Sequence, residues 1–291
     1  METRTTSNNF VAVPAQYNFN DAYSIGEPAL RQLRRDMWDE NPPFNGMPLQ
    51  VYLKRRAITN KEQYANDFVM DAQLSKIAVQ RSAEYIPSVG LRHRRPAQSC
   101  TKAQYRSNGC LKEDTATING YGGWGNNLAG GQGNWSLKYF IQDGWGKGEL
   151  AALKRANGNF DDGNGHLHHF LNPDNKYVGL GIVKMKVNGQ IHTAAASTFA
   201  KKGSGTPNRL PDQRIEDNLY RAAFADENST GIVTFDPNTF RGPQGGGGGG
   251  SSIGVGGGVI GIVTTVISIL SIVGFVAQFI PQIQNTIRQF L

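Results

Sequence analysis

The most informative stretch of this chain runs from residue 165 to residue 183 and reads GHLHHFLNPDNKYVGLGIV. It places His166, His168 and His169, three of the five histidines, directly before an apolar run that is typical of a buried strand. Such a cluster can form a metal site, an acid–base site or a polar rim. Which of these it forms depends on whether residues from elsewhere in the chain join it.

The sequence around this stretch predicts a hairpin. Residues 177–187 and 190–199 both have the apolar character of strands. Asn188-Gly189 lies between them, and this pair is the strongest short signal for a two-residue hairpin turn. Weaker strand candidates lie at 115–121 and 231–235.

The rest of the chain predicts helices, so the fold class is mixed α/β. Apolar residues recur at helical spacing over 27–38, 61–85 and 135–156. Pro28 falls in the first turn of the first of these, where proline is tolerated. The third is expected to be interrupted by Gly144-Trp145-Gly146.

The charge of the chain indicates an anionic partner. Its 30 Lys and Arg exceed its 23 Asp and Glu, for a formal net charge of +7. An acidic envelope polymer, an anionic lipid or a host surface ligand would suit this balance. The simpler alternative is that the basic side chains are scattered and solvated, because the densest run, over 92–95, is short. Since no nucleic-acid-binding motif such as a Cys/His finger occurs, no nucleic-acid partner is predicted.

The C-terminal part of the sequence predicts a membrane anchor. Residues 242–258 are glycine-rich and are typical of a flexible linker. Residues 259–280 are apolar, and a helix of this length would measure about 33 Å, enough for a hydrocarbon core of roughly 30 Å. We therefore predict a transmembrane helix over 259–280 and a short tail over 281–291. A buried core helix and a self-associating apolar tail are the alternatives.

The compartment of the remaining chain depends on its two cysteines. Residues 1–20 are polar, lack the apolar core of a secretory signal and are predicted to be disordered. That alone would give a tail-anchored protein with its bulk in the cytoplasm. Cys100 and Cys110, however, close a short polar loop, which is typical of a disulfide in an oxidising compartment. Two unpaired thiols are the alternative, but the favoured prediction is a single-pass cell-membrane protein with an extracellular domain.

Three blocks of the sequence together resemble the CAP superfamily of cysteine-rich secretory, antigen 5 and pathogenesis-related 1 proteins, in its bacterial form. The first block is AVQRSA (78–83) followed by LRHRRP (91–96), the second is GNNLAGG (125–131), and the third begins at Gly165. Each block is weak by itself. Their order, together with the matching helix and hairpin, makes the set fairly specific.

The resemblance implies an α-β-α sandwich around a central, mainly antiparallel sheet over residues 21–200. Residues 201–241 would then be a polar extension between the domain and the linker. The resemblance also implies a cleft in which two histidines and two acidic residues converge.

In this chain the two histidines of that cleft correspond to His93 and His166. One of the acidic positions is occupied by Asn126, which cannot take up a proton. The other corresponds to Glu149, which lies one residue further from Trp145 than the commoner Trp-x-x-Glu spacing.

These residues allow two kinds of site. His93, His166 and Glu149 could ligate Zn²⁺ with an open water position, with Asn126 orienting one imidazole, and such a site would support a metal-dependent hydrolase. The same groups could instead form a polar cleft that binds a ligand without chemistry, which the missing acid at Asn126 favours. Whether the protein is an enzyme stays open at this point. The favoured prediction is a membrane-anchored, externally displayed CAP-domain protein that binds an envelope or host ligand.

Other candidates near the site are assigned structural roles. His168 and His169 are expected at the rim of the cleft, and His192 on the solvent face of a strand. Three tryptophans lie near the second block: Trp124, Trp135 and Trp145. We expect their indoles to pack in the core, and the alternative is an aromatic wall that binds a sugar or lipid.

Overall fold

The computed structural model describes residues 10–107, 109, 116–118, 120–205 and 210–228. By its contacts the chain divides into Met1–Pro243 and Gln244–Leu291, and every described residue belongs to the first unit. The predicted linker, transmembrane helix, tail and strand over 231–235 lie outside the described residues, as does Cys110. Within the described part of the chain, no helix is both long and apolar enough to cross a bilayer.

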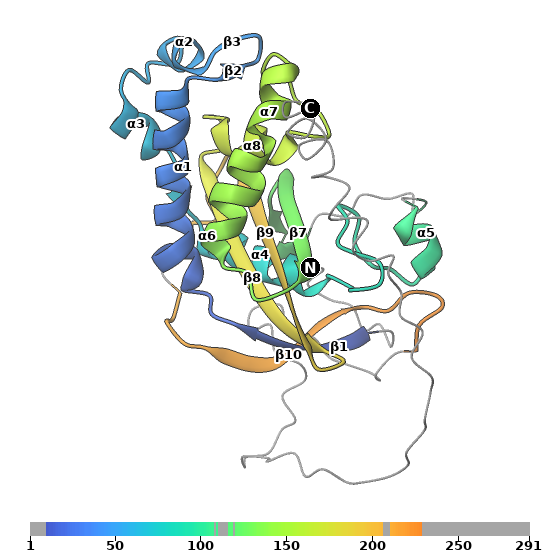
Figure 1. Cartoon of the computed structure of the whole chain (residues 1–291). Coiled ribbons are helices and arrows are strands. Elements are labelled where there is room, and N and C mark those ends of the chain that lie inside the picture. Colours follow the sequence, from blue (N-terminus) through green and yellow to red (C-terminus); the bar gives the residue numbers. More distant parts are fainter. Residues whose placement is uncertain (1–9, 108, 110–115, 119, 206–209, 229–291) are drawn as a thin grey trace, which may run out of the picture. The chain divides into compact units, whose positions relative to one another are not determined.

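A six-stranded, mainly antiparallel sheet forms the centre of the first unit (Figure 1). The short strand β4 (Val69–Met70) pairs in parallel with the first residues of β8. This arrangement confirms the prediction of a mixed α/β fold around a mainly antiparallel sheet. The main strand order is β10 (Ile215–Ala222), β1 (Phe10–Tyr17), β8 (Tyr177–Val187), β9 (Gln190–Ala200) and β7 (Gly125–Gln132).

Strands β8 and β9 form the hairpin that the sequence predicts. Val187 pairs with Gln190, and the antiparallel register continues along both strands. Asn188 and Gly189 both have positive φ, 51° and 79°, as a two-residue type I′ turn requires. The turn fixes the register, and the register decides which side chains of β8 face each side of the sheet.

Helices cover both faces of the sheet (Figure 1). On one face, Leu180 of β8 shares a core with side chains of α1 (Glu27–Glu40) and α8 (Gly165–Leu171). On the other face, Val183 shares a core with side chains of α4 (Ala72–Ala83). The two-residue period of the strand thus divides its apolar side chains between two helical layers.

Helix α4 approaches β8 closely because two glycines of the strand face it. A Cβ atom on Gly179 would lie 2.0 Å from the carbonyl carbon of Leu74, and one on Gly181 would lie 2.4 Å from the amide nitrogen of Val79. Both of these neighbours are backbone atoms, which cannot move aside as the end of a flexible side chain can. The Val-Gly-x-Gly pattern in the third block therefore sets the distance between helix and sheet.

The remaining elements are short and connect these layers. Two-residue strands pair as β2 with β3 and as β5 with β6. In chain order the elements are η1 (Ala22–Gly26), β2 (Pro43–Phe44), β3 (Met47–Pro48), α2 (Leu49–Lys54), α3 (Lys61–Ala65), α5 (Lys102–Arg106), β5 (Thr117–Ile118), β6 (Tyr121–Gly122), α6 (Leu137–Tyr139), η2 (Phe140–Lys147) and α7 (Gly148–Arg155).

The predicted helices agree with the structure to different degrees. The helix over 27–38 is confirmed as α1. The single helix over 61–85 is wrong, because α3 ends at Ala65 and β4 pairs with β8 before α4 begins. Asp71 caps α4 by accepting hydrogen bonds from the amides of Gln73 and Leu74. Over 135–156 the glycines do not interrupt the helical run, which passes from α6 through the π-helical η2 into α7.

The predicted limits of the domain are also corrected. The disorder predicted for residues 1–20 is wrong for β1, whose Ala15 and Tyr17 are buried beside α4. The polar extension predicted over 201–241 contains β10, which pairs with β1 along its whole length. The domain therefore reaches beyond the predicted limits of 21–200 on both sides. Strand β10 (IEDNLYRA) looked polar because it has few apolar residues, whereas β1 (FVAVPAQY) is mainly apolar and was overlooked because polar residues precede it.

Candidate functional site

The candidate site forms around the first residues of β7, the last strand of the sheet. Asn126 and Asn127 are successive residues of this strand, so their side chains point to opposite faces. Each side chain bonds a histidine from a different part of the chain, His93 in one case and His169 in the other. The second block of the sequence is thus the connection between the first and the third.

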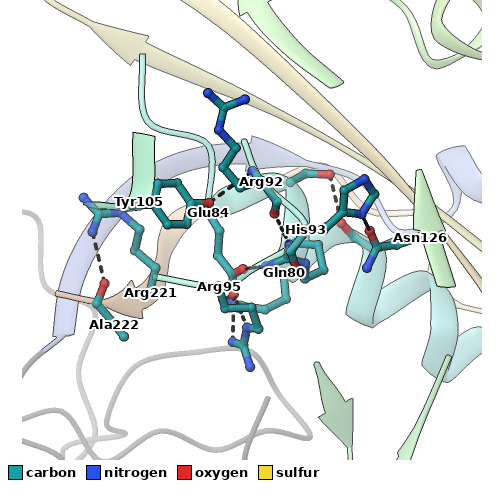
Figure 2. A network of polar contacts seen from close by, with 12 residues as sticks. Gln80, Glu84, Arg92, His93, Arg95, Tyr105, Asn126, Arg221 and Ala222 are labelled. Atoms are coloured by element: carbon teal, nitrogen blue, oxygen red, sulfur yellow. Dashed lines mark hydrogen bonds and ion pairs between the residues drawn. The ribbon is translucent and has the colours of Figure 1, made fainter. Parts of the chain in front are cut away.

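His93 and Asn126 form one pair of the site. The Nδ1–H of His93 donates to Oδ1 of Asn126 over 2.7 Å (Figure 2). Because Oδ1 can only accept, this bond places a proton on Nδ1 of His93. The predicted proximity of His93 and Asn126 is therefore present in the structure.

A buried ion-pair network holds the loop that carries His93 (Figure 2). The guanidinium of Arg81 donates to the carbonyl oxygens of Arg92, at 2.5 Å, and of His93, at 3.0 Å. Arg81 also pairs with Glu84, and both side chains are 1% exposed. Arg95 pairs with the other oxygen of Glu84 at 2.7 Å. The block AVQRSA thus fixes the backbone on either side of the His93 ring.

Glu84 stays ionised within this network. Burial alone would raise the pKa of Glu84, but the positive charges of Arg81 and Arg95 outweigh it and lower that pKa to about 2. Gln80 adds a hydrogen bond to the same carboxylate and a second one to the carbonyl oxygen of Tyr220 in β10. The network therefore joins α4, the His93 loop and the edge of the sheet.

Glu149 and His166 form the second pair. One oxygen of Glu149, on α7, bonds Nδ1 of His166, and the other accepts the amide of Leu167 over 3.0 Å. The carboxylate thereby satisfies a free amide in the first turn of α8 and orients the imidazole. The Trp145 ring lies 5.7 Å from the His166 ring, between centroids. The predicted association of Glu149 with His166 is present, despite the unusual spacing from Trp145.

His169 belongs to the site, although the sequence placed it at the rim. Its Nδ1–H donates to Oδ1 of the buried Asn127 over 2.9 Å, and Asn127 in turn donates to the carbonyl oxygen of His166. Burial, assisted by the positive charges of His166, His168 and His93 when they are protonated, lowers the pKa of His169 to about 4. His169 is therefore neutral at physiological pH and lies near both predicted histidines.

The helical spacing of α8 explains this position. Residues three apart lie on the same side of a helix, and from this side of α8 Nδ1 of His166 bonds Glu149 of α7 while Nδ1 of His169 bonds Asn127 of β7. His168 points elsewhere, stacks on Phe44 at a centroid distance of 4.5 Å and donates from Nε2 to Oδ1 of Asn45. Because no helix was predicted over residues 165–171, the i, i+3 spacing of the two histidines was not recognised.

Three further expectations have separate outcomes. His192 was predicted on the solvent face, but it is 8% exposed and lies beside Tyr85. Trp145 is buried in the core as predicted, whereas Trp124 is 52% exposed. Cys100 is buried, and the predicted disulfide remains a prediction because Cys110 lies outside the described residues.

The predicted zinc ligands do not form a complete ligand set. Zn²⁺ sites in enzymes use three protein ligands and an open position. Among the described residues, which include His93, Glu149 and His166, no three His, Cys, Asp or Glu side chains are placed to hold one metal ion.

Comparisons with protein-family models, with curated proteins and with solved structures give no match for this chain. The resemblance to the CAP superfamily therefore depends on the three blocks and on where the structure places their residues.

Proposed function

We propose that this chain is a membrane-anchored, externally displayed CAP-domain protein whose domain binds an anionic polysaccharide of the cell envelope. The assignment to the family is supported by the meeting of the three blocks, since His93 bonds Asn126 and the carbonyl of His166 accepts from Asn127. Helical layers on both faces of a mainly antiparallel sheet agree with the α-β-α sandwich of that family. The anionic class of ligand is supported by the net charge of +7.

The observation that carries the binding role is an exposed aromatic pair at the histidine site. Trp124 is 52% exposed and Phe160 is 58% exposed, the two most exposed large hydrophobic side chains among the described residues. Their ring centroids lie 5.4 Å and 5.5 Å from that of His169. Aromatic rings beside a few oriented polar groups are typical of ligand sites, and ring faces bind the apolar faces of sugars.

The alternative function is a metal-dependent hydrolase that uses His93, His166 and Glu149. The positions of the described residues give it no support, because these side chains form parts of two hydrogen-bonded pairs and do not supply three ligands to one ion. Stoichiometric zinc in purified protein, together with loss of that zinc on replacing His93, would reverse this preference.

Replacing the exposed aromatic residues is expected to weaken polysaccharide binding. Trp124→Ala and Phe160→Ala should each raise the Kd for polygalacturonate by about ten-fold, as is usual for an aromatic anchor. Titration calorimetry of the full chain in detergent measures this. Val51→Ala is the control, because Val51 is 41% exposed and is not part of the site. Unchanged affinity in both aromatic variants would show that the polysaccharide does not bind at this site.

The external location has its own test. If the domain faces an oxidising compartment, Cys100 and Cys110 are disulfide-bonded, and a maleimide reagent should label neither of them before reduction. Mass spectrometry of protein isolated from membranes, with and without reductant, gives the labelled fraction. Full labelling of both thiols without reductant would instead support the tail-anchored cytoplasmic alternative.

A further inference from the structure

A second feature lies next to the histidine site and shares Trp124 with it. This is a cavity of ≈ 650 Å³, which is within the range of roughly 300–1,000 Å³ that small-molecule sites occupy. Three segments line it: the turn that leads into β7, the residues after α8, and the turn after β9. The cavity thus lies between the segment that precedes the second block and residues of the third block.

The lining of the cavity carries excess positive charge. Lys201 and Lys202 are both exposed, and neither ammonium group has a carboxylate partner among the described residues. The acidic residue of the lining, Asp174, is already paired with Arg56. The charges of the two lysines are therefore not neutralised by the described part of the protein, and an anionic ligand could pair with them.

The backbone under these side chains is fixed. The hydroxyl of Tyr121 donates to the carbonyl oxygen of Lys202 over 3.0 Å, which ties the turn after β9 to the opposite wall. The amide of Trp124 donates to the carbonyl oxygen of Phe199 over 2.9 Å. A Cβ atom on Gly123 would lie 2.3 Å from the Thr198 side chain, so only glycine allows this segment to lie so close to β9. The Trp124 indole and the two lysine side chains therefore extend from backbone whose position these contacts fix.

From this arrangement we infer that the cavity is a subsite for the acidic group of a charged sugar unit. The sugar ring lies against Trp124, and its carboxylate or sulfate group pairs with Lys201 and Lys202. Lysine suits this role because its ammonium is a compact charge on a flexible stem. The inference rests on the proposed function and deepens it, because it names an acidic sugar as the unit that the domain recognises.

The test compares ligands that differ only in charge. Full-length protein in detergent is titrated with an oligogalacturonate and with its methyl ester, which has the same sugar rings without the carboxylate charges. The double variant Lys201→Ala/Lys202→Ala should bind the oligogalacturonate about five- to ten-fold more weakly, and its preference over the ester should disappear. The loss should shrink at high salt, because the lysines are exposed.

A matched control separates the subsite from net charge. Lys54→Ala/Lys138→Ala removes the same number of positive charges from exposed positions that do not line the cavity. This variant should stay within about two-fold of the wild type. A sulfated dextran oligosaccharide is the second anionic probe, and dependence of its binding on Lys201 and Lys202 would support recognition by charge.

The possible failures are distinguishable. Equal losses in the two double variants would overturn the subsite, because the effect would then come from net charge. If Trp124→Ala weakens binding and the Lys201/Lys202 variant does not, the subsite is wrong and the proposed function stands. If the wild-type protein binds none of the polysaccharides, both are wrong.

Discussion

Replacing Gly179 with alanine is expected to lower the free energy of unfolding by about 3 kcal/mol or more, because the added methyl group has no space. Its Cβ would lie 2.0 Å from the carbonyl carbon of Leu74 and 2.3 Å from the carbonyl oxygen of the same residue. To relieve this clash, α4 must move away from β8, and this movement would also loosen the core between them. Urea denaturation followed by circular dichroism measures the loss.

The control for this variant is Gly131→Ala. Gly131 lies on β7 of the same sheet, and a Cβ atom there would meet nothing within 4 Å. The free energy of unfolding of the Gly131→Ala variant should change by about 0.5 kcal/mol or less. Any change should be a slight rise, because alanine restricts the unfolded chain. If the two variants were equally stable, the close approach of α4 to β8 would be refuted.

Replacing Glu84 with glutamine is expected to cost about 3–5 kcal/mol of stability, because it leaves the buried charge of Arg81 without a counter-charge. Arg95 would lose the same partner. Chemical denaturation at pH 7 measures the effect. The matched control is Glu62→Gln, which breaks the exposed pair with Arg35 and should leave the free energy of unfolding nearly unchanged.

The acid dependence of stability gives a second measurement on the same network. The pKa of Glu84 is lowered to about 2 in the folded protein, below the ordinary value of 4.5 in the unfolded chain. The unfolded state therefore takes up a proton first, so this contribution to stability is present above pH 4.5 and is lost as the pH falls from 4.5 to 2. Glu84→Gln should show a smaller loss over this interval than the wild type, and identical curves would contradict the assignment.

The parts of the fold that the sequence predicted are those decided by local contacts. The hairpin at Asn188-Gly189 needs only two residues with positive φ, and α1 needs only its own helical period. The helix over 61–85 failed because β4 is a strand only by pairing with β8, more than a hundred residues later. A helical pattern carries no information about such a partner.

In the candidate site, too, residues in local sequence patterns were predicted and residues whose role depends on distant contacts were missed. His93, Asn126 and His166 were found as members of ordered blocks and Glu149 from its spacing to Trp145, and the structure joins the four as two pairs. His169 was missed because its role depends on α8 being a helix and on Asn127 facing that helix. The exposure of Trp124 could not be predicted either, since an indole between glycines gives no sign of which side remains uncovered.

The pairing of β1 with β10 has a consequence for how the chain is made. Gln16 of β1 and Glu216 of β10, which hydrogen-bond to each other, are 200 positions apart. At ordinary rates of translation β1 leaves the ribosome about 10–40 s before β10 is complete. During that interval the outer edge of β1 has no strand to pair with, so the nascent chain is most prone to misassociation at β1. This edge is covered only after β10 has been synthesised and has paired with β1.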